Sequence, residues 1–156
     1  MTKKESDEPK RQLKPILVIS VVFVCFVTIV FLAQKKDSID WIEDYNAGIE
    51  LAKKQNKPVL LAFYKRSTRF STDMWNNTYN NPEVKSHVET NFVPVLIDVD
   101  KQPKIAEQYK VSYYPSHFVK DPNTDRIVGP RLGYDPPALF ITELEILQKK
   151  LNSAKD

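Results

Sequence analysis

One stretch of the sequence, Val59-Leu60-Leu61-Ala62-Phe63-Tyr64, decides the fold. Six consecutive apolar or aromatic residues without alternation are typical of a strand that is buried on both faces of a sheet. Pro58 ends the preceding segment, and the polar residues 65–73 indicate a loop that leads into a helix. A second run of the same kind, at 92–99, predicts a neighbouring central strand. Two such strands indicate an α/β protein whose sheet is covered by helices.

The segments around these strands supply the rest of the pattern, because apolar residues recur there at helical spacing and Pro stands at helix starts. We expect helices at 40–55, from Met74 and Trp75 onward, from Pro82, at 104–109 and at 136–150. Further strands are expected at 113–120 and 126–128, joined by the turn 121–125, with a second turn at Gly129-Pro130. This order predicts a central mixed β-sheet flanked by helices.

The N-terminal region predicts a membrane anchor. Residues 16–33 form an apolar run without any charged residue. The length of this run is about the minimum for a helix that spans a bilayer. Phe31, at the −3 position of a candidate cleavage site, opposes removal of the segment as a signal peptide. We therefore divide the chain into a basic cytoplasmic N-terminus (1–15), a transmembrane signal anchor (16–34), a junction (35–38) and a soluble domain (39–152).

The charge distribution sets the expected orientation and excludes one class of partner. Five Lys or Arg residues precede the apolar run and two follow it, which predicts a cytoplasmic N-terminus and an extracytoplasmic domain, periplasmic or exterior in a bacterium. Residues 1–36 carry a net charge of +4 and residues 37–156 a net charge of −1. Because the domain itself is nearly neutral, we expect no nucleic-acid partner.

The domain has no sulfur chemistry of its own, because the single cysteine, Cys25, lies inside the apolar run. We therefore expect neither a disulfide nor a thiolate metal ligand in the domain. His87 and His117 lack the spacing of a metal site, and His117 is expected to be structural. We expect no metal and no cofactor.

Four short motifs in the correct order resemble the thioredoxin superfamily over about residues 39–150. These are the Lys57-Pro58 strand ending at Tyr64, the segment 95–111, Tyr113-Tyr114-Pro115-Ser116, and Arg131-Leu132-Gly133-Tyr134. The stretch 75–82 is similar to a branch with a lengthened second helix, which includes periplasmic disulfide-reductase domains and anterior-gradient-like proteins. The resemblance implies a thioredoxin fold behind the N-terminal anchor.

The resemblance also locates a degenerate active site. Thr68-Arg69-Phe70-Ser71 stands where the family has Cys-x-x-Cys, so hydroxyls replace both sulfurs. A hydroxyl cannot form the mixed-disulfide intermediate, because exchange requires a thiolate. Ala62 stands where the family has a buried Asp that handles protons. Disulfide reduction and isomerisation are therefore not expected, and the enzyme interpretation is the weaker one.

The peptide-binding part of the family's site is retained. In the family, a residue before a cis proline pairs its backbone with an extended substrate, and Tyr114 and Pro115 are the matching residues. Phe70 and Trp75 are candidates for an aromatic groove beside them, although such residues also serve as core. Lys65, Arg66 and Arg69 are candidates for an anion site, the alternative being a solvated loop. Thr68 or Ser71 could instead act only as a helix cap.

The leading hypothesis is a membrane-anchored, non-catalytic module that binds a protein or peptide on the extracytoplasmic side. One alternative is a divergent enzyme with oxidoreductase-type or glutathione-related activity through a hydroxyl. Another is a structural subunit of a membrane assembly.

Overall fold

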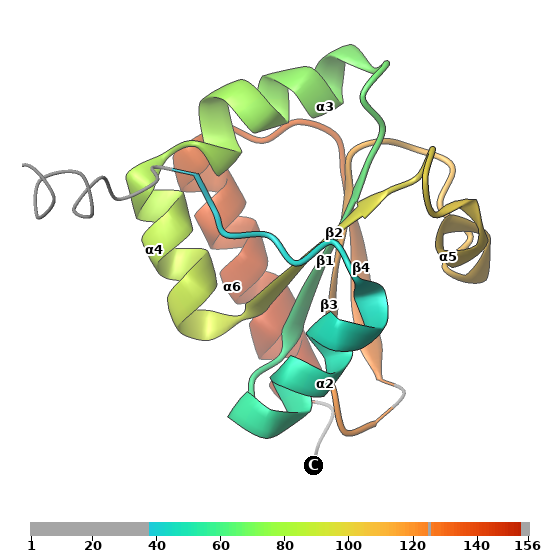
Figure 1. Ribbon diagram of the computed structural model, residues 1–156. Coiled ribbons are helices and arrows are strands. Elements are labelled where there is room, and N and C mark those ends of the chain that lie inside the picture. The colour runs from blue at the N-terminus through green and yellow to red at the C-terminus, as the bar shows by residue number, and fades with distance from the viewer. Residues whose placement is uncertain (1–37, 125, 154–156) are drawn as a thin grey trace, which may run out of the picture. The chain divides into compact units, whose positions relative to one another are not determined.

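The described part of the chain folds around a four-stranded mixed sheet. The structure, a computed structural model, describes residues 38–124 and 126–153, so the predicted segments 1–15 and 16–34 lie outside it. The strands are β1 (Val59–Tyr64), β2 (Val93–Asp98), β3 (Ser116–Lys120) and β4 (Ile127–Leu132), in the order β2-β1-β3-β4 (Figure 1). β1 is parallel to β2 and antiparallel to β3, and β3 is antiparallel to β4. The predicted mixed sheet is confirmed.

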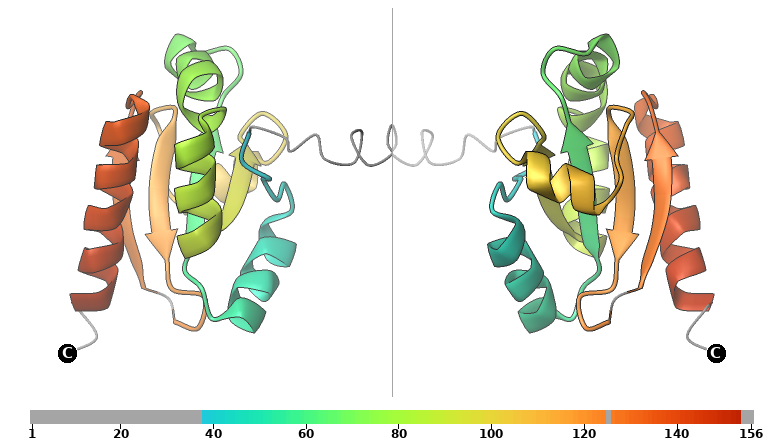
Figure 2. Two further views of the ribbon diagram at one scale, coloured as in Figure 1. Left: turned by 90° about the vertical axis from the view of Figure 1, so that its left-hand side faces the viewer. Right: turned by 90° about the vertical axis from the view of Figure 1, so that its right-hand side faces the viewer.

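Helices cover both faces of the sheet (Figure 2). One face, called the α4/α6 face, packs against η1 (Met74–Tyr79), α4 (Pro82–Asn91) and α6 (Pro137–Ser153). The opposite face, called the α2/α5 face, packs against α2 (Tyr45–Gln55) and α5 (Pro103–Gln108). Each face has its own apolar core, and successive residues of β1 contribute to the two cores in turn, as the pleat of a strand requires.

The first helix begins later than the predicted 40–55. Asp44 is its N-cap and accepts a hydrogen bond from the Ala47 amide at 2.8 Å. The residues before it are extended, because Ile42 forms a β-bridge with Val95. The amide of Ile42 donates to the carbonyl of Pro94, and its carbonyl accepts from the amide of Leu96, both at 3.0 Å. Pairing with the edge of β2 thus keeps this segment extended, although the spacing of Trp41 and the apolar residues after it is typical of a helix.

The second helix is composed of two forms. A short α-helix, α3 (Arg69–Asp73), continues directly into the π-helical η1. The chain then restarts at α4, where the Asn81 side chain accepts hydrogen bonds from the amides of Glu83 and Val84. The helix start predicted at Pro82 is confirmed.

The hairpin of β3 and β4 corrects two boundaries. β3 begins at Ser116 rather than at 113, because residues 113–115 form a turn that contains the cis Tyr114-Pro115 peptide. β4 runs through Gly129-Pro130, where a turn was predicted, and ends at Leu132. Neither Gly129 nor Pro130 is paired with β3, because the register of the two strands shifts between His117 and Val119, and an edge strand tolerates a proline at such an irregularity.

Within residues 38–124 and 126–153, no helix has the length and apolar character that a bilayer crossing requires.

Candidate functional site

Three segments meet at one end of the sheet. Phe63 on β1 is paired with Ser116 on β3, so the loop after Tyr64 and the turn that ends at Pro115 lie at the same end of neighbouring strands. The amide of Gly133, after β4, donates to the carbonyl of Pro115 at 2.9 Å. The segments 65–71, 113–115 and 132–134 therefore form one surface around the cis proline.

The two hydroxyls in the Cys-x-x-Cys positions contact one another. Thr68 Oγ1 and Ser71 Oγ are hydrogen-bonded at 2.7 Å, although Ser71 is fully buried and Thr68 is only half-buried. Thr68 Oγ1 also lies 3.0 Å from the carbonyl of Lys65, and the amide of Lys65 donates to Ser71 Oγ at 3.3 Å.

These contacts close a ring. Each hydroxyl has one proton, so one assignment satisfies every contact: Lys65 N–H to Ser71, Ser71 to Thr68, and Thr68 to the Lys65 carbonyl. Thr68 is the N-cap residue of α3, but its side chain makes no capping hydrogen bond. The alternative that Thr68 serves as a helix cap is therefore wrong for its side chain, which closes the loop instead. Within the described chain, no titratable side chain is hydrogen-bonded to either hydroxyl.

The position of the family's buried acid is apolar. Ala62 is fully buried and lies opposite His117 in the pairing of β1 with β3. His117 is itself fully buried, and its Nε2 is 2.6 Å from the hydroxyl of Tyr79. Burial lowers the pKa of His117 to about 3 and raises the pKa of Tyr79 well above its ordinary value. Both groups are therefore neutral at pH 7, and the expected structural role of His117 agrees with this pairing.

The aromatic candidates do not all lie at the turn. Phe70 on α3 is 58% exposed, and Tyr113, which precedes Tyr114 in the sequence, is 68% exposed. Tyr114 is half-buried and packs against the core of the α2/α5 face, whereas Trp75 packs against the core of the α4/α6 face. The structure therefore does not bring Trp75 to the same side of the sheet as Tyr114.

The backbone of Tyr114 is open for pairing. In the part of the chain that the structure describes, neither its amide nor its carbonyl has a hydrogen-bond partner. Its side-chain hydroxyl donates to the carbonyl of Val111 at 3.3 Å, which fixes the ring. Leu132, which is 44% exposed, lies next to Gly133 at the same end of the sheet, and the sequence places it only within the motif 131–134, not among the binding candidates. Its sequence signals are its place in that motif and its position beside the predicted turn.

The three cations of the loop have separate surroundings. Lys65 Nζ is 3.9 Å from Asp100 and 5.9 Å from the ring centroid of Tyr114. Arg69 pairs with Asp73 at 3.6 Å on the exposed side of α3. Arg66 lines a pocket between α3 and the end of β2. The structure therefore does not gather Lys65, Arg66 and Arg69 into one anion site.

Among the described residues, no group of three or more His, Cys, Asp or Glu side chains is arranged to hold a metal ion.

Comparison with known proteins places this geometry in a family. A family model named Thioredox_DsbH, described as "Protein of unknown function, DUF255", matches residues 27–116, which is more than half of the chain. Spermatogenesis-associated protein 20 of Rattus norvegicus is 26% identical over 78 residues. The match covers 50% of this chain but only 10% of the length of that relative.

Solved structures show the fold. A thioredoxin from Thermus thermophilus superimposes with a TM-score of 0.67 at 24% identity, over 76% of this chain and 94% of that chain. The C-terminal domain of Neisseria meningitidis DsbD in its oxidised form gives 0.60 at 25% identity, over 69% and 98%. A DsbH oxidoreductase gives 0.64 at 18% identity, over 72% and 85%. The predicted thioredoxin fold is confirmed, and the domain is related to the disulfide oxidoreductases.

Proposed function

Since the chain belongs to the Thioredox_DsbH family, we propose that its domain is a non-catalytic module that binds an extended peptide or protein segment at Tyr114 and Pro115. The observation that carries the proposal is the open backbone of Tyr114, whose amide and carbonyl have no partner within the described residues. An extended peptide can pair with such a backbone as an added strand would. The exposed side chains of Phe70, Tyr113 and Leu132 supply apolar contacts beside it.

The non-catalytic part of the proposal rests on the ring of hydrogen bonds at Thr68 and Ser71. Disulfide exchange needs a thiolate, and residues 38–156 contain no cysteine. Both hydroxyls are already engaged with each other and with the backbone of Lys65. In this proposal, the loop that carries the redox chemistry in thioredoxins is held by its own hydrogen bonds and lies beside the binding turn.

The proposal includes the membrane anchor at 16–34, which would hold the domain on the extracytoplasmic side. Its support is the uncharged run of residues 16–33 and the excess of Lys and Arg before it. The partner in this proposal is therefore a protein or peptide outside the cytoplasm.

The test uses the full-length chain and a phage-displayed library of unstructured heptapeptides. We expect the double variant Phe70→Ser/Tyr114→Ala to bind the selected peptides at least about tenfold more weakly, because exposed aromatic anchors carry much of the energy of such contacts. The matched control is Ile146→Ser, which changes a 41% exposed apolar residue on α6 and should leave binding unchanged.

A second measurement isolates the backbone contact. Methylation of one peptide nitrogen removes a hydrogen-bond donor without changing the side chains, so methylation at a single position should abolish binding. A peptide that tolerates methylation at every position, or that binds the double variant as tightly as the wild type, would contradict the proposal.

One alternative keeps oxidoreductase-type activity at Thr68, and the relation to a DsbH oxidoreductase is the observation behind it. Insulin reduction and glutathione conjugation by the full-length chain, each compared with Thr68→Ala, separate the two functions. We expect no turnover above the uncatalysed rate in either assay. Turnover that disappears in the variant would favour the enzyme.

A further inference from the structure

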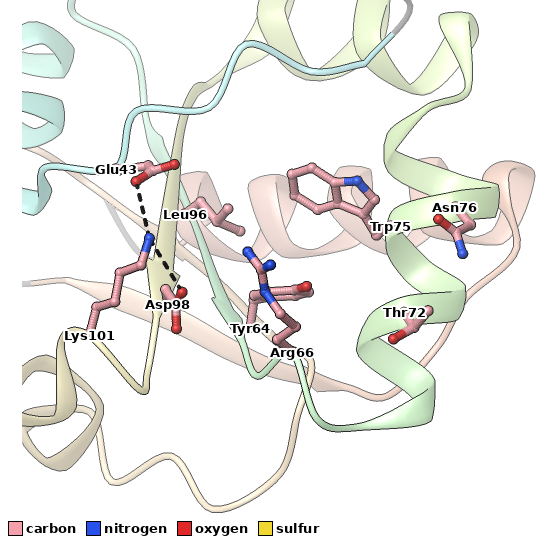
Figure 3. A pocket seen from close by; sticks show the side chains of 9 residues that line it. All are labelled: Glu43, Tyr64, Arg66, Thr72, Trp75, Asn76, Leu96, Asp98 and Lys101. Carbon is pink, nitrogen blue, oxygen red and sulfur yellow. Dashed lines mark ion pairs between the residues drawn. The ribbon is translucent and has the colours of Figure 1, made fainter.

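A pocket lies beside the loop that follows β1. Its volume is about 330 Å³, and its walls come from segments that are far apart in the sequence (Figure 3). Tyr64 ends β1 and Trp75 belongs to η1, while Leu96 and Asp98 belong to β2. The pocket therefore opens at the carboxyl ends of the two parallel strands, which is the edge where α/β proteins commonly bind small ligands.

One wall of the pocket is apolar and aromatic. The rings of Tyr64 and Trp75 have centroids 5.7 Å apart and are tilted by 48°. Leu96, only 6% exposed, lies beside them on β2. Such a surface suits a flat apolar group, which can lie against the rings.

Of the four charged side chains that line the pocket, three are ion-paired with one another. Lys101 Nζ lies 3.9 Å from a carboxylate oxygen of Glu43 and 3.7 Å from one of Asp98, so both acids already face a cation. Arg66 extends its guanidinium group toward the side of Tyr64 and Trp75 (Figure 3). Within residues 38–124 and 126–153, Arg66 makes no ion pair and no hydrogen bond.

The guanidinium group of Arg66 favours an anionic ligand. Arginine has five N–H donors, no acceptor, and a charge that persists at all relevant pH values. Among the described residues that line the pocket, Arg66 is the charged group that lacks a partner, and a ligand that meets it accepts hydrogen bonds. The formal charges of Glu43, Asp98, Arg66 and Lys101 cancel, so a ligand with one negative charge is tolerated better than one with two.

We propose that this pocket binds a small monoanion in which a carboxylate is attached to a flat apolar group, with Arg66 as the partner of the carboxylate. The apolar group lies against Tyr64 and Trp75, and Asp98 and Glu43 disfavour phosphate dianions. The site is independent of the proposed peptide binding, because Tyr64 and Trp75 pack on the core of the α4/α6 face and Tyr114 packs on the other.

The test is a titration of the ¹⁵N-labelled full-length chain, followed through the indole N–H signal of Trp75. The sequence has two tryptophans, Trp41 and Trp75, so the two signals can be assigned with a Trp41→Phe variant. Phenylacetate is the probe, and phenylacetamide is its neutral match in shape. We expect phenylacetate to shift the Trp75 signal and to bind about five- to tenfold more tightly than the amide, as a charge-assisted hydrogen bond would give.

Matched arginine variants locate the carboxylate. Arg66→Gln should reduce phenylacetate binding to the level of the amide, whereas Arg69→Gln, a change at an 89% exposed side chain, should leave it unchanged. Equal affinity for phenylacetate and phenylacetamide, an unaffected Arg66→Gln variant, or an unshifted Trp75 signal would each overturn the proposal. Tighter binding of phenyl phosphate than of phenylacetate would overturn the assignment to a carboxylate.

Discussion

The two faces of the sheet are built by different means. Beneath the α4/α6 face, buried polar groups are bonded to one another: Tyr79 to His117, and Thr78 Oγ1 to the carbonyl of Asp135 at 2.6 Å. Beneath the α2/α5 face the buried core is apolar, and the part-buried hydroxyls of Tyr45 and Tyr109, which pack against it, are hydrogen-bonded at 2.6 Å. These polar bonds join η1 to β3 and to the segment before α6, whereas the core of the other face is formed by apolar side chains.

Lys85 on α4 makes a further set of polar contacts, which join α4 to the segment before the first helix. Its side chain is only 8% exposed, and its ammonium donates to the carbonyl of Ser38 at 2.9 Å, to Asp40 at 3.0 Å and to Glu89 at 2.8 Å. Burial lowers the pKa of Lys85, but the hydrogen bonds to Glu89 and Asp40 outweigh it, so the pKa is raised. Lys85 thus binds the entering chain to α4 and remains charged.

The largest expected effect is that of Lys85→Met. This change leaves two carboxylates and one carbonyl without their shared donor, so we expect the free energy of unfolding to fall by about 3 kcal/mol. Urea denaturation of the full-length chain measures it. The control is Lys53→Met, which breaks an exposed pair with Glu50 and should change stability little. Equal effects of the two variants would show that the hydrogen bonds of Lys85 to Ser38, Asp40 and Glu89 do not stabilise the fold.

The second prediction concerns pH. Burial lowers the folded-state pKa of His117 to about 3, whereas the unfolded chain titrates near its ordinary value. Below that ordinary value the unfolded state binds a proton that the folded state does not, so stability falls as the pH decreases. Between pH 8 and pH 5 the expected loss from this group is about 2 kcal/mol.

The double variant Tyr79→Phe/His117→Leu removes the titrating group together with its partner, which avoids leaving either hydrogen-bonding atom unpaired. Unfolding free energies of both proteins at pH 8 and pH 5 give the comparison. The loss should be smaller in the variant by the amount assigned to His117. Parallel pH curves for the two proteins would rule out the neutral, buried His117.

The smallest predicted effect lies on the apolar face. A Cβ atom at Gly48 would lie 2.3 Å from Cγ2 of Val95, so Gly48→Ala overfills the contact between α2 and β2. The gain in helix propensity, about 1 kcal/mol, offsets part of an overpacking cost of about 1–3 kcal/mol. We expect a net loss of about 1 kcal/mol in thermal or chemical denaturation.

A double-mutant cycle tests the cause of that loss. Val95→Ala removes the methyl group that a side chain at position 48 would strike, so the two substitutions together should cost less than the sum of their separate effects. Strict additivity would mean that the collision is relieved in another way.

Much of the fold was predictable because its signals are local. The apolar runs at 59–64 and 92–99 and the helix start at Pro82 each depend on neighbouring residues, and the structure has them as β1, β2 and α4. The prediction that failed at 40–44 marks a place where sheet pairing overrides local preference, whereas Gly129-Pro130 lies unpaired at an irregularity within β4 instead of in a turn after it.

The site was predictable only in part. The sequence by itself determined that residues 38–156 contain no thiol, and that hydroxyls stand at 68 and 71. Only the tertiary structure decided that these hydroxyls close a ring with Lys65, that His117 meets Tyr79, and that Trp75 and Arg66 line a separate pocket. Residue identity is carried by the chain, but which side chains meet depends on strand register and on the face to which each one points.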